Sequence, residues 1–96
     1  MSQRVILVIY DIHDDKLRLK VANFLKRLGF ARIQRSAFSS PHSSALLSEV
    51  EAGLRKLTRD QTRYDIQVYV ISKSSYDERL VISHGYTPEE GEELLL

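Results

Sequence analysis

The strongest hydrophobic pattern in the chain is the unbroken aliphatic run from Val5 to Ile9, followed by Tyr10. A continuous apolar run of this length, rich in β-branched residues, predicts a strand over residues 4–11 that is buried on both faces. The strand ends at Asp11, a lone carboxylate. A central strand holds such a carboxylate rigidly at an opening, which is a common place for chemistry, although the strand alone favours a structural role. The alternative is that Asp11 begins a turn or caps the next helix.

Apolar residues recur at helical spacing in the next segment and predict an amphipathic helix over residues 15–28. Asp14 or Asp15 can accept hydrogen bonds from the free N–H groups of its first turn. Gly29 can adopt the left-handed conformation that ends many helices. The apolar stripe, which we expect to face the sheet, consists of Leu17, Val21, Leu25 and Leu28, with Phe24 beside it.

The segment from 31 to 42 has no purely apolar side in a regular strand. This predicts a bulge, a bend or a hairpin of two short strands, with the position of the break left open. Pro41 should stop any ladder. Further along, alternating residues predict a strand over 65–72, a polar loop over 73–79 and a last short strand over 80–83.

A second helix is predicted between these strands, from Ser43 or Ser44 to about Thr58. Gly53 is a weak point in it, costing up to ~1 kcal/mol relative to alanine unless a backbone packs closely there. The buried face of this helix is expected to carry Leu46, Leu47, Val50, Leu54 and Leu57.

The predicted order of strand, helix, strands, helix and strand is the split βαβ, or ferredoxin-like, arrangement of an α+β fold. Both helices would cover one face of an antiparallel-rich sheet and leave the other face open. Ile9, Tyr69 and Ile71 would then need cover that one chain does not supply. A homodimer packed sheet on sheet supplies it, and the surplus strand over 80–83 can pair with the partner's sheet edge.

Length and charge narrow the class of protein. Ninety-six residues make one small domain, which we place at 1–86, with an acidic tail over 87–96. The chain has no cysteine, no signal segment and no apolar run near the ~20 residues that cross a bilayer, so we expect a soluble cytoplasmic protein without membrane contact.

The charged residues are unevenly distributed along the chain. Residues 1–73 carry 13 Lys and Arg against 7 Asp and Glu, whereas residues 74–96 carry one Arg against 6 acidic residues. This basic body suggests a surface for phosphates; the alternative is a solvated basic surface with a disordered acidic end.

Four stretches are informative together: the strand ending in Tyr10-Asp11, the helix with Arg18 and Lys20, the segment Arg32-Ile33-Gln34-Arg35-Ser36-Ala37-Phe38, and Glu51-Ala52-Gly53-Leu54. In this combination the chain resembles the small CRISPR-associated endoribonuclease family that partners the CRISPR integrase in spacer acquisition. The resemblance covers nearly the whole chain. Its most specific part is the hydrophobic strand ending in Tyr-Asp with a downstream Arg-Ile-Gln-x-Ser-x-Phe.

The resemblance implies an obligate ferredoxin-like homodimer in which the C-terminal strand crosses onto the other subunit. It also implies a metal-dependent endonuclease acting on single-stranded RNA or double-stranded DNA, with Mg²⁺ at Asp11. The alternative within the family is a non-catalytic DNA-binding scaffold of the integration complex. A third option, a regulatory domain for a small ligand, is disfavoured by the basic body. The family's functional positions fall on Tyr10 beside the catalytic Asp11, and on Arg18, Lys20, Arg32 and Phe38 for nucleic acid.

The chemistry of each side chain limits the role that the resemblance implies for it. One carboxylate binds Mg²⁺ weakly, so two Asp11 side chains facing each other across a dimer axis make a more plausible site for a hydrated ion that activates water. Asp14 is either a helix cap or a second ligand. Lys20 stands where arginine is often seen, and a lysine keeps the charge but loses the bidentate fork. Phe38 either stacks on a base or fills the core, and Tyr10 either transfers a proton or makes a structural hydrogen bond.

Overall fold

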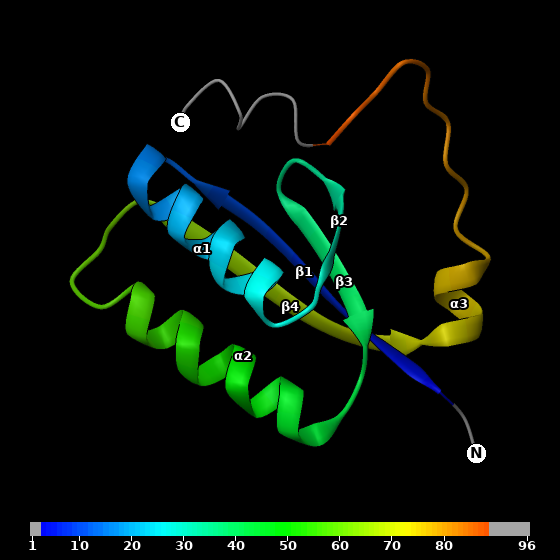
Figure 1. The fold of residues 1–96 in the computed structure, drawn as a ribbon, viewed down its shortest axis with the longest axis horizontal. Helices are drawn as coiled ribbons and strands as arrows, with labels where there is room; N and C mark the ends of the chain where they lie inside the picture. The colour runs from blue at the N-terminus through cyan, green and yellow to red at the C-terminus, as the bar shows by residue number, and fades with distance from the viewer. Residues whose placement is uncertain (1–2, 89–96) are drawn as a thin grey trace.

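The computed structural model describes residues 3–88 and shows the predicted α+β fold (Figure 1). Four strands form an antiparallel sheet in the order β2-β3-β1-β4. The strands span Arg4–Ile12 (β1), Ala31–Gln34 (β2), Ala37–Pro41 (β3) and Tyr64–Ser72 (β4). The helices span Asp15–Arg27 (α1), Ser44–Leu57 (α2) and Lys73–Asp77 (α3). None of the helices in this part of the chain is long and apolar enough to cross a membrane.

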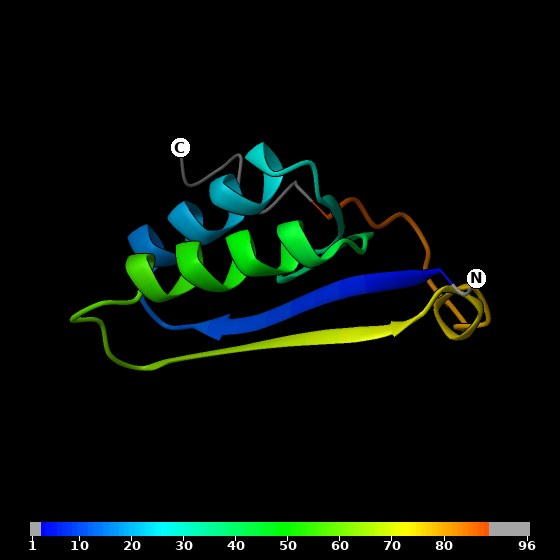
Figure 2. The ribbon, with the colours of Figure 1, turned by 90° about the horizontal axis from the view of Figure 1, so that it is seen from below.

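Helices α1 and α2 cover one face of the sheet, and Figure 2 shows the other face without such cover. Alternate residues of β1 point to the two faces. Those on the helix side lie in the core: Ile6, Val8, Tyr10 and Ile12. Leu7 and Ile9 point to the opposite side, here called the open face, and are only partly buried. The predicted burial of β1 therefore holds on the helix side, and residues 3–88 do not fully cover its other side.

The helix ends follow the predicted capping residues. The Asp14 carboxylate accepts a hydrogen bond from the backbone N–H of Leu17 at 2.7 Å, and the Ser43 hydroxyl accepts one from Leu46 at 3.0 Å. These bonds satisfy N–H groups that have no partner within the helix. Gly29 follows α1 with a φ of 92°, the left-handed conformation predicted for it.

The predicted irregularity in residues 31–42 is both a hairpin and a bulge. Strands β2 and β3 pair on either side of a turn, and their register shifts between Arg32 and Gln34. Pro41, expected to stop any ladder, is itself the last residue of β3 and lies opposite Val5. A strand end tolerates proline because the missing N–H removes no interior ladder bond.

The prediction of a polar loop over residues 73–79 was wrong. Residues 73–77 form α3 instead of a polar loop, with the Ser72 side chain accepting from the backbone N–H of Ser75 and with Lys73 paired to Asp77 at 2.6 Å. Capping and a pair at this spacing support even a short helix. Residues 80–83 form no strand in the single chain. Pairing with a partner's sheet edge needs a second chain and stays a prediction.

The segment after α3 runs away from the sheet and returns toward the turn between β2 and β3 (Figure 1). There the backbone N–H of Arg35 donates to the Tyr86 hydroxyl at 2.9 Å. Between these points the side chains of Leu80, Val81 and Ile82 are 83%, 64% and 87% exposed. Most of the predicted acidic tail, from residue 89 onward, lies outside the described residues.

Gly53 marks a close approach between α2 and α1. A Cβ atom placed on Gly53 would lie 2.0 Å from Cζ of Phe24, a separation at which something must move. Phe24 packs against the core from α1. The sequence allowed for close packing by a backbone at this glycine, and the structure shows an aromatic ring there instead.

Gly53→Ala is expected to destabilise the protein by about 1–2 kcal/mol, although alanine is the better helix former. The reason is that the new methyl group displaces the Phe24 ring. In a Phe24→Ala background the same substitution should stabilise by up to about 1 kcal/mol. Urea unfolding of the wild type, both single variants and the double variant measures this coupling. Equal effects of Gly53→Ala in both backgrounds would show that the ring is not the cause.

Candidate active site

Two carboxylates lie side by side at the carboxyl end of β1. Strands β1 and β4 pair antiparallel, and their register sets Asp11 directly opposite Asp65. Opposed residues point to the same face, with Cβ atoms about 4.5–5.5 Å apart. Both residues are exposed on the open face, and the Asp65 carboxylate also accepts from the Gln67 side-chain amide at 3.0 Å. The result is a like-charged pair that a cation can bridge.

A shallow hollow of about 380 Å³ surrounds this pair and is also lined by His13, Arg63 and Tyr64. The backbone N–H of His13 donates to the carbonyl of Arg63 at 3.1 Å, which closes the end of the β1–β4 ladder. Arg63 has a φ of 58°, uncommon for a residue other than glycine, and turns the chain into β4. The residues that line the hollow are thus two aspartates, an arginine, a histidine and a tyrosine.

Asp65 is not among the residues predicted from the sequence, where the second carboxylate was expected from the Asp11 of another subunit or from Asp14. A signal for Asp65 was available. Asp11 ends the first predicted strand and Asp65 begins the strand predicted over 65–72. If those strands are antiparallel neighbours with aligned ends, the two aspartates lie opposite each other.

The basic residues predicted on α1 do not share the face of Asp11, because α1 covers the other side of the sheet. Arg18 reaches the end of β1 from that side: its guanidinium group donates to the carbonyl of Ile12 at 3.1 Å and pairs with Asp15. Lys20 is exposed on α1. Asp14 caps the helix, so its carboxylate is engaged there and not at Asp11.

The other three predicted positions form one stack on the helix side of the sheet. The ring of Tyr10 is stacked on that of Phe38, with centroids 6.2 Å apart, and the Arg32 guanidinium carbon lies 5.0 Å from the Phe38 centroid. Tyr10 and Arg32 both donate to the carbonyl of Arg35, at 3.4 Å and at 2.6–3.1 Å. Phe38 has no exposed surface, so no base can stack on its ring in this conformation. The stack holds the β2–β3 turn and lies apart from Asp11.

The carboxylate pair fits a magnesium ion. Mg²⁺ is usually held by one or two carboxylates, with waters and substrate phosphates completing its octahedron. Asp11 and Asp65 supply two such oxygen ligands within one chain. No group of three or more histidine, cysteine or acidic side chains gathers among residues 3–88, so a fully protein-enclosed metal cage is absent from that part of the chain.

Comparison with known proteins decides the family. The family model described as CRISPR associated protein Cas2 matches residues 4–79. The chain belongs to the Cas2 family. This membership confirms the resemblance found in the sequence, and it covers the described strands, all three helices and the hollow around Asp11.

Three relatives and one structure show how far the likeness to other proteins extends. A CRISPR-associated endoribonuclease Cas2 from Korarchaeum cryptofilum is 53% identical over 51 residues, 53% of this chain and 55% of that protein. A CRISPR-associated endoribonuclease Cas2 from Pyrobaculum aerophilum is 36% identical over 72 residues. The aligned residues cover 75% of this chain and 78% of that protein. A Cas1/Cas2 endonuclease fusion from Thermoproteus tenax is 36% identical over 77 residues, 80% of this chain but 29% of the fusion. The crystal structure of a hypothetical protein from Thermus thermophilus matches with a TM-score of 0.70 and 31% identity, covering 92% of this chain and 100% of that one.

The match therefore spans about half of the Korarchaeum Cas2 and less than a third of the fusion. The solved structure, at 31% identity, supports the predicted fold class for this Cas2-family chain. All 13 Lys and Arg residues of the basic body, and the strand ending in Tyr10-Asp11, lie within the matched residues.

Proposed function

We propose that this chain is a Mg²⁺-dependent endonuclease that hydrolyses phosphodiester bonds in single-stranded RNA or double-stranded DNA and takes part in spacer acquisition. The observation that carries the proposal is the Asp11–Asp65 pair in the hollow at the end of β1 and β4. Membership in the Cas2 family, whose matched members are named endoribonuclease or endonuclease, supports the reaction class.

Each residue of the hollow has a task in this proposal. Asp11 and Asp65 would hold the ion, which when bound activates water and offsets negative charge on the phosphate. Arg63 at the edge of the hollow attracts the substrate phosphate. Arg18 fixes the end of β1 from the other side of the sheet through its bond to the Ile12 carbonyl. We assign Tyr10 a structural role, because its ring is buried on the face opposite to Asp11.

Purified protein incubated with labelled single-stranded RNA and with duplex DNA tests the proposal. Cleavage is expected with Mg²⁺ and is expected to stop with EDTA, because two carboxylates alone do not activate water for attack on phosphorus. Cleavage of either substrate at full rate in EDTA would contradict the proposed metal dependence.

A second candidate function has its own observation. The Thermoproteus relative is a single chain that joins Cas1 to Cas2. This favours a binding partnership between this chain and a separate Cas1 protein, the CRISPR integrase. In that role the chain would be a DNA-binding scaffold of the integration complex, and the chemistry of Asp11 would be dispensable for integration.

Nucleic-acid binding in both roles is expected to weaken steeply with salt. Each phosphate contact adds about 0.9 to the slope of log affinity against log salt for duplex DNA, and about 0.7 for single strands. Lys20 is exposed and its substitution should leave the fold intact. Fluorescence anisotropy at several salt concentrations should give Lys20→Ala a slope lower by about one contact, whereas Lys20→Arg keeps it. An unchanged slope in Lys20→Ala would show that Lys20 does not contact a phosphate of the bound nucleic acid.

We also propose that two copies pack through their open faces. Leu7, Ile9 and Ile71 are only partly buried on this face, and Tyr69 is 44% exposed. Strand β4 is one of the two edge strands of the sheet, and the exposed apolar residues 80–82 can supply a strand to a partner's edge.

Light scattering is expected to give twice the mass of one chain at micromolar concentration. Val81→Asp is expected to weaken the dimer, because a charge would be buried where the apolar segment docks. Ser74→Asp, an exposed change on α3, is the matched control. A folded wild-type monomer at micromolar concentration would rule the dimer out.

A further inference from the structure

Helix α1 presents a row of basic side chains on the side that faces away from the sheet. Lys16, Lys20 and Arg27 are exposed and follow one another at spacings of four and seven residues, so they lie on one stripe of the helix. Lys26 is exposed beside this stripe, and the four cations are here called the basic face of α1. The buried side of the helix carries Leu17, Val21, Ala22 and Leu25.

Carboxylates within residues 3–88 do not neutralise the stripe. In that part of the chain Asp15 pairs with Arg18, and Lys16, Lys20 and Arg27 form no ion pair. A cation in the last turn, such as Arg27, suits the helix dipole, but Lys16 lies in the first turn, where a positive charge is unfavourable. Helix stability therefore does not account for the stripe as a whole.

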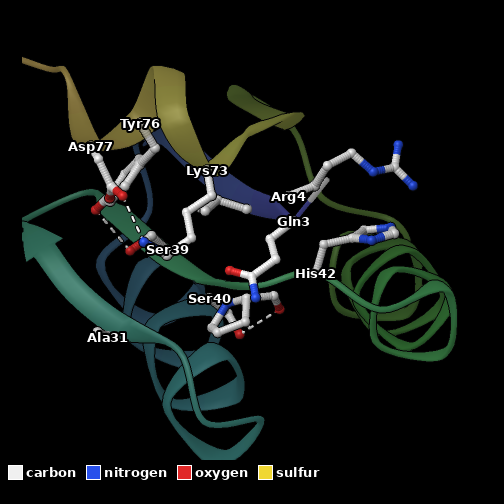
Figure 3. Close-up of a pocket in the computed structure, with 11 residues that line it drawn as sticks. Gln3, Arg4, Ala31, Ser39, Ser40, His42, Lys73, Tyr76 and Asp77 are labelled. Carbon is white, nitrogen blue, oxygen red and sulfur yellow. Dashed lines mark hydrogen bonds and ion pairs between the residues drawn. The ribbon is translucent and has the colours of Figure 1, made fainter. Parts of the chain in front are cut away.

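The segment that leads to the acidic end of the chain is attached to the rest of the molecule at two points. At its start the hydroxyl groups of Tyr76 on α3 and Ser39 on β3 are 3.0 Å apart (Figure 3). Beyond α3 the segment passes from the level of the sheet to the side of the helices (Figure 2). There the bond from the Arg35 backbone N–H to the Tyr86 hydroxyl, 2.9 Å long, holds residue 86 at the β2–β3 turn.

The β2–β3 turn lies near the amino-terminal end of α1. The backbone N–H of Tyr10 donates to the carbonyl of Ser36 in that turn at 3.0 Å, and α1 begins soon after β1, at Asp15. Residues 87–93 can span at most about 25 Å at about 3.3–3.6 Å per residue. Helix α1 is about 20 Å long at about 1.5 Å per residue. The chain beyond Tyr86 can therefore reach the basic face of α1.

We propose that the acidic segment over residues 89–93 binds the basic face of α1 in its own chain and competes there with nucleic-acid phosphates. This segment reads Glu-Glu-Gly-Glu-Glu, so four carboxylates complement the four cations. Carboxylate oxygens accept hydrogen bonds from Lys and Arg as phosphate oxygens do. Exposed ion pairs are weak, but a short tether gives an effective concentration of about millimolar. The competition rests on the proposed nucleic-acid binding, whereas the docking does not.

NMR spectra of the full chain without nucleic acid test the docking. The wild type is compared with a variant in which Glu89, Glu90, Glu92 and Glu93 are all changed to Gln. Resonances of Lys16, Lys20 and Arg27 should differ between the two proteins, and high salt should remove the difference because it screens exposed charges. Lys56, exposed on α2, is the internal control and should not shift. Identical spectra along α1, or equal shifts at Lys56, would overturn the proposal.

Fluorescence anisotropy with duplex DNA, without Mg²⁺, tests the competition. At low salt Glu92→Gln/Glu93→Gln should bind about three- to tenfold more tightly than the wild type, because fewer ion pairs must break before DNA binds. Glu49→Gln/Glu78→Gln is the matched control: both residues are exposed, and the change in net charge is the same. Equal gains in both variants would show that only net charge matters, and no gain would show that the tail does not compete; either result overturns the competition. The NMR comparison contains no nucleic acid, so failure of docking is distinguishable from failure of nucleic-acid binding.

Discussion

Phe38→Ala is expected to lower the free energy of unfolding by about 3–5 kcal/mol, the usual cost of removing a fully buried phenylalanine. Phe38 has no exposed surface and lies between the Tyr10 ring and the Arg32 guanidinium group. Truncation leaves a cavity and removes the stacking partner of both neighbours. Urea unfolding followed by circular dichroism measures the change.

Phe38→Leu separates packing from contact with nucleic acid. Leucine retains much of the buried volume, so its cost should be close to 1 kcal/mol and the protein stays folded. If Phe38 is a core residue, the Leu variant binds RNA and DNA as the wild type does. A folded Leu variant that has lost nucleic-acid affinity would show that the ring contacts a base, and the core interpretation would be wrong.

Much of the fold was predictable because its signals are local. The apolar run of β1 and the helical periodicity of α1 and α2 fix their type, and Asp14 and Ser43 fix where the helices begin. Residues 80–83 show the limit of such signals. Leu80, Val81 and Ile82 have strand composition, but a strand needs a neighbour, and none of the strands formed by residues 3–88 pairs with them.

The candidate site was predictable only in part, because side-chain direction depends on pairing between distant strands. Tyr10 and Asp11 are adjacent in sequence but point to opposite faces, which separates a pair that the sequence placed together. Arg32 joins Tyr10 through Phe38, in the stack that holds the β2–β3 turn. Asp65 joins Asp11 through the register of β1 and β4. Spacing along the chain alone gives neither grouping, and the Asp11–Asp65 pair also requires that β1 and β4 be antiparallel neighbours with aligned ends.

Asp11→Asn is expected to lower Mg²⁺-dependent cleavage by about 10²- to 10³-fold, because it keeps the shape of the side chain and removes the charge that holds the ion. The Asp11→Asn variant should still fold. Asp11 is exposed, and the substitution relieves repulsion with Asp65, worth about 0.2–1 kcal/mol for opposed like charges. Nucleic-acid affinity should stay the same or rise, since one negative charge facing the phosphates is gone. Cleavage at the wild-type rate would place the chemistry elsewhere or in a contaminating nuclease.

The same variant assayed for integration with Cas1 separates the two candidate functions. Integration that survives while cleavage is lost would mean that nuclease activity is real and separable from the scaffold role.

Asp65→Asn then decides how the ion is held. If the ion lies between Asp11 and Asp65 of one chain, this variant needs a far higher Mg²⁺ concentration for half-maximal cleavage. If two Asp11 side chains hold it across a dimer axis, Asp65→Asn titrates with Mg²⁺ as the wild type does. Gln67→Ala is the matched control, because it removes the amide bonded to Asp65 and leaves both carboxylates in place.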